Sequence, residues 1–169
     1  MQCLQRPRGV TLIEVLVAVL VCSVGLIGMA ALLVTSARSN HAAYLRTQVS
    51  FLAQGMADRM RANPAGVRSG GYNGSFPNGS TQDCESGCTP AQLAMHDRGV
   101  WSRQLQTLLP AGARATIACR QDGAFAPVGQ SPYGGRCTMT MTWAESGQGA
   151  AGSDENDRAM QTLAWEFQP

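Results

Sequence analysis

The sequence has no lysine, and its 13 basic residues, all arginine, face 11 acidic ones. The formal net charge of +2 gives no electrostatic footprint for nucleic acid. Only two histidines are present, His41 and His96, and the usual metalloprotease, hydrolase, phosphate-loop and dinucleotide-binding motifs are absent. The composition therefore offers no support for an enzyme or for a nucleic-acid-binding protein, and we expect no cofactor and no metal.

Charge is also nearly absent from residues 10–34, where Glu14 is the one charged residue and proline does not occur. A helix rises about 1.5 Å per residue, so this run can cross a hydrocarbon core about 30 Å thick. Arg6 and Arg8 precede the run and should stay in the cytoplasm. A carboxylate at mid-bilayer costs roughly 2.5–3.5 kcal/mol, less near an end. Because the run holds no other charge, we expect Glu14 to find its partner outside it.

The residues Arg8-Gly9-Val10-Thr11-Leu12-Ile13-Glu14 resemble the type III signal of type IV pilins. The resemblance implies that prepilin peptidase removes residues 1–9 by cutting after Gly9 on the cytoplasmic side. It also implies that Val10 becomes the methylated N-terminal residue and that Glu14, then the fifth residue, acts in assembly. Two departures from the family pattern are visible. Val10 stands where phenylalanine is commoner, and the span lacks the proline frequent in major pilins, which favours a minor pilin.

Two other interpretations of this segment remain open. An ordinary secretory signal peptide would have an apolar core of about 7–15 residues and a small-residue cleavage site. Thr35-Ser36-Ala37 offers such a site, but the apolar run is too long and would hold Glu14 inside its core. A plain single-span anchor accounts for the length of the run and leaves Glu14 unexplained.

The helical pattern continues beyond the apolar run. One stripe recurs at spacings of three and four residues, as in a helix with one buried face. Its members are Leu45, Val49, Leu52, Met56 and Met60. Asn63-Pro64 should end the helix. We therefore expect one helix over residues 10–62, with residues 10–34 in the membrane, residues 35–62 in the periplasm, and a globular head over residues 63–169.

Two further segments resemble PilV-type minor pilins. The first is Ala57-Asp58-Arg59-Met60-Arg61-Ala62-Asn63-Pro64, and the second is Cys88-Thr89-Pro90-Ala91-Gln92-Leu93-Ala94 followed by Asp97, Trp101 and Leu109-Pro110. Arg59 or Arg61 could bind a partner, although arginines also favour a helix C-terminus simply through the helix dipole.

The remaining pattern predicts a polar loop, a second helix and three strands. Residues 65–88 should form the loop. Thr89, Pro90 and Gln92 form a capping signal for a helix that closes at Leu109-Pro110. Its inward stripe comprises Leu93, Trp101, Leu105 and Leu108, and Asp97 on the same stripe is expected to be a paired structural carboxylate. Alternation predicts strands over residues 113–119, 137–143 and 160–167, with an exposed loop over 144–159. The fold class is thus α+β: a long N-terminal helix packed on a small antiparallel sheet with a second short helix, as in type IV pilins.

Cysteine usage fits an oxidising compartment. Cys3 would leave with the leader and Cys22 lies in the span, whereas Cys84, Cys88, Cys119 and Cys137 fall in the exported part. Four cysteines there indicate two disulfides, for which three connectivities exist. Strand phase favours Cys119–Cys137, and the short turn favours Cys84–Cys88. Zinc is the alternative, but the second pair is too widely spaced for a usual ligand set.

The resemblance implies a minor pilin of the type IV pilus that takes part in assembly initiation near the fibre tip, in twitching motility and adhesion. Its expected partners are prepilin peptidase, other minor and major pilins, and the bacterial inner membrane, with the C-terminal domain in the periplasm before entry into the fibre. The alternatives are a minor pseudopilin of a type II secretion system and a periplasmic binding module on a plain anchor.

Overall fold

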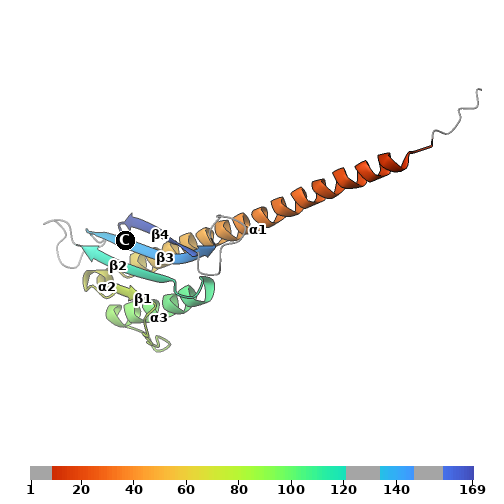
Figure 1. Cartoon of the computed structure of the whole chain (residues 1–169). Helices are drawn as coiled ribbons and strands as arrows, with labels where there is room; N and C mark the ends of the chain where they lie inside the picture. Colours follow the sequence, from red (N-terminus) through yellow and green to blue (C-terminus); the bar gives the residue numbers. More distant parts are fainter. Residues whose placement is uncertain (1–8, 121–133, 147–157) are drawn as a thin grey trace, which may run out of the picture. The chain divides into compact units, whose positions relative to one another are not determined.

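The computed structural model describes residues 9–120, 134–146 and 158–169 (Figure 1). The chain divides into two compact units, residues 1–40 and residues 41–169, and we call the second unit the head. Both units contribute to the long helix α1 (Leu12–Ala62). The helix was expected over residues 10–62, and it begins two residues later, at Leu12, since Val10 and Thr11 are not helical. Its predicted end at Asn63-Pro64 is confirmed.

The head contains a four-stranded antiparallel sheet of order β1-β2-β3-β4. The strands are β1 (Gly74–Phe76), β2 (Arg114–Arg120), β3 (Arg136–Ser146) and β4 (Arg158–Phe167). Two helices accompany it, α2 (Pro64–Arg68) and α3 (Pro90–Leu108). The α+β class, with a long helix packed on a small antiparallel sheet, is confirmed.

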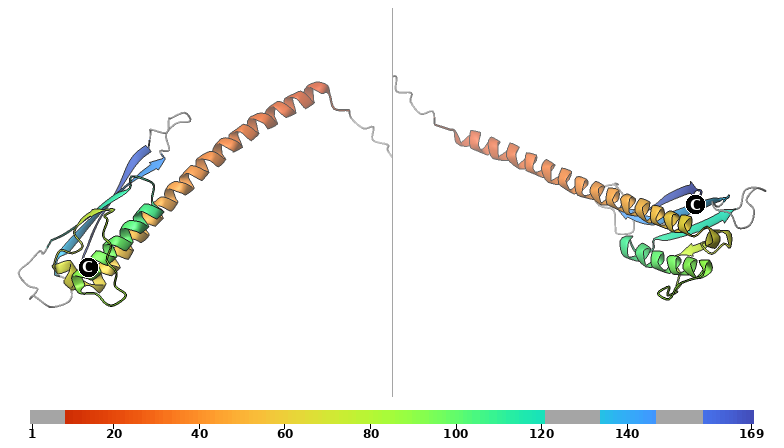
Figure 2. Two further views of the ribbon diagram at one scale, coloured as in Figure 1. Left: turned by 90° about the horizontal axis from the view of Figure 1, so that it is seen from below. Right: turned by 180° about the vertical axis from the view of Figure 1, so that it is seen from behind.

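The core lies between the sheet and two helices. Figure 2 shows α3 and the C-terminal part of α1 on the same side of the sheet. The whole predicted stripe of α1 is buried there, together with Trp101 and Leu105 of α3 and the inward residues Ile117, Met139 and Met141 of the strands. Each such apolar side chain stabilises the fold by about 1.5–3 kcal/mol on burial. The alternation of apolar and polar residues in the sequence therefore determines which face of the sheet packs on the core.

The start of α3 follows the capping signal. Thr89 accepts a hydrogen bond from the backbone of Gln92, and the Gln92 side chain accepts one from the backbone of Thr89. The inward stripe is confirmed at Trp101 and Leu105, whereas Leu93 is only half-buried and Ala94 is fully buried in its place. A small residue faces the core at that turn because α2 packs closely against α3 there.

Two predicted loops are wrong in part. Residues 65–88 contain α2 and β1, because Asn63 caps α2 by accepting a hydrogen bond from the Gly66 amide and Pro64 occupies the first turn. The predicted loop over 144–159 is shorter, because β3 continues to Ser146 and β4 begins at Arg158. Its middle, residues 147–157, lies outside the described residues.

Candidate functional site

The segment that precedes α1 is open to solvent. Gly9, Val10 and Thr11 are not helical, and Val10 is 68% exposed. A side chain built on Gly9 would meet nothing within 4 Å. This segment can therefore enter the cleft of a processing enzyme in an extended conformation. The rest of the predicted leader, with Arg6 and Arg8, lies outside the described residues.

Thr11 caps the helix and places Glu14 in its first turn. The Glu14 amide donates to the Thr11 carbonyl at 3.1 Å and approaches the Thr11 hydroxyl at 3.4 Å, while the Val15 amide donates to the same carbonyl at 3.3 Å. A carboxylate near a helix N-terminus is favoured by the helix dipole. In the described part of the chain, no basic side chain pairs with Glu14. Its carboxylate is thus available to a cation from another molecule.

The apolar part of α1 carries its large side chains outward. Between Val10 and Val34 the large hydrophobic residues are 52–78% exposed. By its length and apolar composition this helix can cross a membrane, although a secretory signal sequence has the same two properties. An apolar surface of this extent needs lipid or protein against it. Together with the preceding segment, it forms the candidate site of processing and assembly, which we define as residues 9–34.

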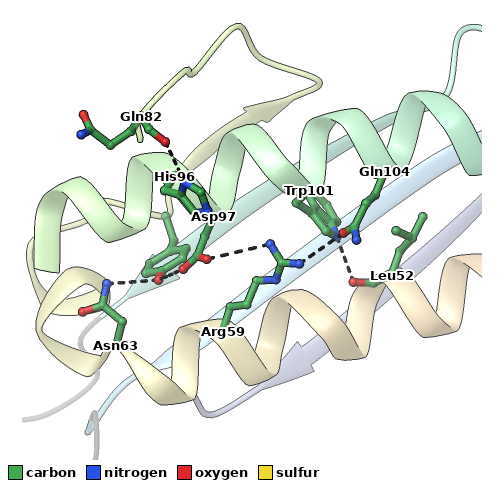
Figure 3. A network of polar contacts seen from close by, with 9 residues as sticks. Leu52, Arg59, Asn63, Gln82, His96, Asp97, Trp101 and Gln104 are labelled. Carbon is green, nitrogen blue, oxygen red and sulfur yellow. Dashed lines mark hydrogen bonds and ion pairs between the residues drawn. The ribbon is translucent and has the colours of Figure 1, made fainter. Parts of the chain in front are cut away.

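A second group of polar residues lies in the head, where α1 ends beside α3 (Figure 3). The Tyr72 hydroxyl donates to Asp97 Oδ2 at 2.6 Å, and Asn63 Nδ2 donates to the same hydroxyl at 3.1 Å and to the Pro90 carbonyl at 2.8 Å. Arg59 Nη1 lies 3.9 Å from Asp97 Oδ1. The group joins the end of α1, the segment before β1 and the start of α3.

The electrostatics of this group identify it as structural. Burial raises the pKa of the Tyr72 phenol well above its ordinary value, and the hydrogen bond to Asp97 raises it further. The phenol therefore stays protonated and serves as a fixed donor to Asp97. The prediction that Asp97 is a paired structural carboxylate is confirmed.

The neighbouring residues are also engaged within the head. His96 Nδ1 lies 2.6 Å from the Gln82 carbonyl oxygen, so His96 and Asp97 face different partners. The Trp101 indole donates to the Leu52 carbonyl at 2.9 Å. The Trp101 contact anchors α3 on α1, whereas the His96 contact joins α3 to the segment that precedes it (Figure 3).

The two arginines at the end of α1 differ in their surroundings. Arg59 is 29% exposed and also donates to Gln104 at 3.4 Å, so it binds α3 through both contacts. Arg61 pairs at 2.8 Å with Asp58 at the surface. Of the two, Arg61 is the one that remains accessible to another protein.

Two disulfides are present in the head. Cys84 is bonded to Cys88, and Cys119 of β2 is bonded to Cys137 of β3, its register partner. Cys22 is a free, exposed thiol on α1. The paired thiols are therefore not free to bind zinc in this structure.

One ion pair, between an exposed arginine and a buried carboxylate, was missed by sequence reasoning. Arg46 Nη2 lies 3.2 Å from Glu145 Oε2, and Glu145 is only 4% exposed. Glu145 fell within the loop predicted over residues 144–159, which was assigned from its glycines and from Asp154, Glu155 and Asp157. Alternate residues of a strand share a face, so Glu145 lies on the same inward face as Trp143. This spacing was the one signal for its position in the sequence.

Comparison with known proteins identifies the N-terminal segment. Residues 4–30 match the family model described as the prokaryotic N-terminal methylation motif. Neither a curated protein nor a solved structure matches the chain. The motif indicates a type IV pilin-like or pseudopilin protein that is processed by prepilin peptidase, and proteins with this motif are structural proteins. With the exposed apolar helix, it also indicates membrane anchoring and association with a pilus.

Proposed function

We propose that this chain is a PilV-type minor pilin of the type IV pilus, which helps to initiate assembly and enters the fibre near its tip. The observation that carries the proposal is the accessible Gly9-Val10 bond, four residues before a carboxylate at the start of an apolar helix. The methylation motif over residues 4–30 supports the processing step. The Arg-Met-Arg-Ala-Asn-Pro run over residues 59–64 supports the PilV type.

Processing is the first step of the proposed function. Prepilin peptidase cuts after Gly9 on the cytoplasmic face, and the new amine of Val10 is methylated. Residues 10–34 then hold the chain in the inner membrane, while residues 35–62 and the head over 63–169 lie in the periplasm. The Cys84–Cys88 and Cys119–Cys137 disulfides fit that oxidising compartment.

Assembly uses the charge that processing creates. The mature N-terminus is a cation at Val10, and Glu14 is an anion four residues further along the chain, in the first turn of α1. A neighbouring subunit shifted by about one helical turn would bring its Val10 amine beside Glu14. An isolated carboxylate in an apolar setting is costly, and a close cation offsets that cost. Glu14 thus selects a neighbouring pilin in one axial position.

The experiment compares Glu14→Ala with Glu85→Ala, which removes an exposed acid of the head. Each variant replaces the wild-type gene in the host bacterium, and sheared pili, twitching and secretion of extracellular proteins are measured. We expect Glu14→Ala to insert normally, since its span is more apolar, and to be lost from the fibre with a loss of twitching. Glu85→Ala should behave as wild type.

Other outcomes distinguish the alternatives. Loss of protein secretion with normal twitching would instead identify a pseudopilin of a type II secretion system. Normal piliation and normal association of Glu14→Ala with other minor pilins would contradict the assembly role of Glu14.

A further inference from the structure

The head contains the tripeptide Asn-Gly-Ser twice, at residues 73–75 and 78–80. In an Asn-Gly pair the backbone nitrogen of the glycine can attack the side-chain amide of the asparagine, because glycine has no side chain to hinder that close approach. The two copies have the same local sequence. Any difference in their reactivity must therefore come from the fold around them.

The first copy is held by the sheet. Asn73 Oδ1 accepts the backbone N–H of Cys119 at 2.9 Å, so Cys119 directs its backbone groups toward the β1 side of β2. Ile117, two residues away on the same strand, directs its groups the same way and is the register partner of Gly74. The Gly74 N–H is therefore the donor of a ladder hydrogen bond to Ile117. It cannot attack Asn73 unless that bond is broken.

The second copy has a free nucleophile. Gly79 lies after β1 and outside any helix or strand, and among the described residues its N–H has no hydrogen-bond acceptor. A side chain built on Gly79 would meet nothing within 4 Å, so the backbone there has room to move. The Gly79 nitrogen can approach the Asn78 side chain without the loss of a hydrogen bond.

The Asn78 side chain is arranged for that attack. Its Oδ1 accepts the Ser80 N–H at 3.3 Å, which folds the side chain back over the Gly79 peptide as in an Asx turn. The Ser102 hydroxyl donates to the same oxygen at 3.2 Å. These two donors would stabilise the negative charge that Oδ1 gains when its carbon is attacked. Asn78 Nδ2, the leaving group, is buried and has no hydrogen-bond partner in the described part of the chain.

We propose that Asn78-Gly79 is a site of spontaneous backbone modification, at which the chain closes a succinimide ring and opens it to aspartate or isoaspartate. The Gly79 nitrogen bonds to Asn78 Cγ and gives its proton to solvent. The bond from Cγ to Nδ2 then breaks, and Nδ2 takes a proton and leaves as ammonia. Water adds to one of the two ring carbonyls, whose C–N bond breaks to leave a carboxylate. One water is consumed and one ammonia is released, with no oxidation or reduction.

The modification changes how this segment is attached to α3. Asn78 contacts Ser102 twice, because its backbone N–H also donates to the Ser102 hydroxyl at 3.0 Å. Ser102 is 2% exposed, so these bonds fix the segment on a buried part of α3. Isoaspartate inserts the side-chain carbon into the backbone, and the two bonds to Ser102 can then no longer form together. The segment between β1 and α3 therefore loosens as the protein ages. The inference depends on the head alone and is independent of the proposed function.

The experiment incubates the full chain in mild detergent at mildly alkaline pH. Tandem mass spectrometry of peptides locates each converted asparagine and separates isoaspartate from aspartate. We expect Asn78 to convert at least about fivefold faster than Asn73, since reaction at Asn73 requires the loss of one ladder hydrogen bond. Near-ultraviolet circular dichroism shows that the head stays folded during the incubation.

Gly79→Ala is the matched variant. A methyl group has space at this position, so the fold should be retained, while the methyl group hinders the approach of the backbone nitrogen to Asn78. We expect this variant to slow the conversion of Asn78 and to leave that of Asn73 unchanged. In guanidinium, where the sheet is lost, the two tripeptides of the wild-type chain should convert at equal rates.

Four results would overturn the proposal. Two concern the folded wild-type chain: equal conversion of Asn78 and Asn73, or an intact Asn78 when both sites react in guanidinium. The third is conversion of Asn78 at the wild-type rate in Gly79→Ala. The fourth is a product that contains aspartate without isoaspartate, because direct hydrolysis of the side chain forms no ring.

Discussion

The buried hydrogen bond between Tyr72 and Asp97 should contribute far more stability than the ion pair of Asp58 and Arg61 at the surface. Tyr72 is 0% exposed and Asp97 is 8% exposed, and their oxygens lie 2.6 Å apart. Hydrogen bonds to charged groups are worth about 1.5–3 kcal/mol, and a buried group left unpaired costs about 1–3 kcal/mol. Tyr72→Phe and Asp97→Ala should each destabilise the head by about 2–3 kcal/mol, with a coupling energy of about 1.5–3 kcal/mol in the double variant.

The pair of Asp58 and Arg61 is the matched control. Its atoms are 2.8 Å apart, but the side chains are 71% and 48% exposed. Solvent screening and side-chain entropy limit such a pair to about 0.3–0.5 kcal/mol. Asp58→Ala should therefore hardly change the free energy of unfolding. This holds even though the ion pair that it removes is shorter, at 2.8 Å, than the 3.9 Å between Arg59 and Asp97.

Thermal unfolding followed by near-ultraviolet circular dichroism measures these effects in the full chain in mild detergent. The first 40 residues contain no Trp, Tyr or Phe, so the signal comes from the head. For a unit of this size about 1 kcal/mol corresponds to roughly 4 °C in the midpoint. We expect shifts of about 8–12 °C for each buried substitution and about 2 °C or less for Asp58→Ala. Additive effects of Tyr72→Phe and Asp97→Ala within about 0.5 kcal/mol would refute the direct hydrogen bond as their source.

Four further predictions follow from the same structure. The stability that Tyr72 contributes should be fully present below about pH 10 and should fall as the pH rises above it, because the unfolded Tyr72 phenol ionises there while the folded one stays protonated; Tyr72→Phe should reduce that fall in a midpoint-against-pH series. Cys119→Ser should lower the melting midpoint more than Cys84→Ser, since the chain-entropy model assigns about 3 kcal/mol to the longer loop and less to the shorter one, and non-reducing peptide mapping should recover the two pairs separately. Gly9→Leu should leave the precursor uncut, seen as an unshifted band on a gel, because a bulky side chain replaces the open glycine before the cleaved bond. Glu14→Ala should insert into membranes as wild type does and should fail to co-purify with other minor pilins.

The long helix and the inward face of the strands were predictable because each has a strong period. Burial at Leu45, Val49 and Leu52 follows a helical spacing of three and four residues. Cys137 and Met139 follow strict alternation. The capping residues of α3 were readable because their side chains bond locally to the backbone.

The missed features depend on tertiary contacts. The strand β1 has three residues, too few for a period, and it exists through pairing with β2. Glu145 is inward because β3 continues past Trp143 through its pairing with β4, and its partner Arg46 is far away in sequence. The helix α2 had a readable signal, since Asn63-Pro64 both ends one helix and begins another, but the stop was read without the start.

The candidate site of residues 9–34 and the polar group of the head differ in the same way. Gly9, Val10 and Glu14 were proposed as site residues from local sequence, because a processing enzyme recognises a short segment. The connection of Asp97 to Tyr72 could not be read from the sequence, because it joins α3 to a segment before β1 whose path depends on α2 and Asn63.

Mass spectrometry of the N-terminus of the protein purified from its own membranes tests the central claim most directly. We expect a chain that begins at Val10 and carries one methyl group on its amine. A chain that begins near Arg38, as a secretory signal peptide would leave it, or one that retains residues 1–9 beside an active prepilin peptidase, would contradict the assignment as a pilin.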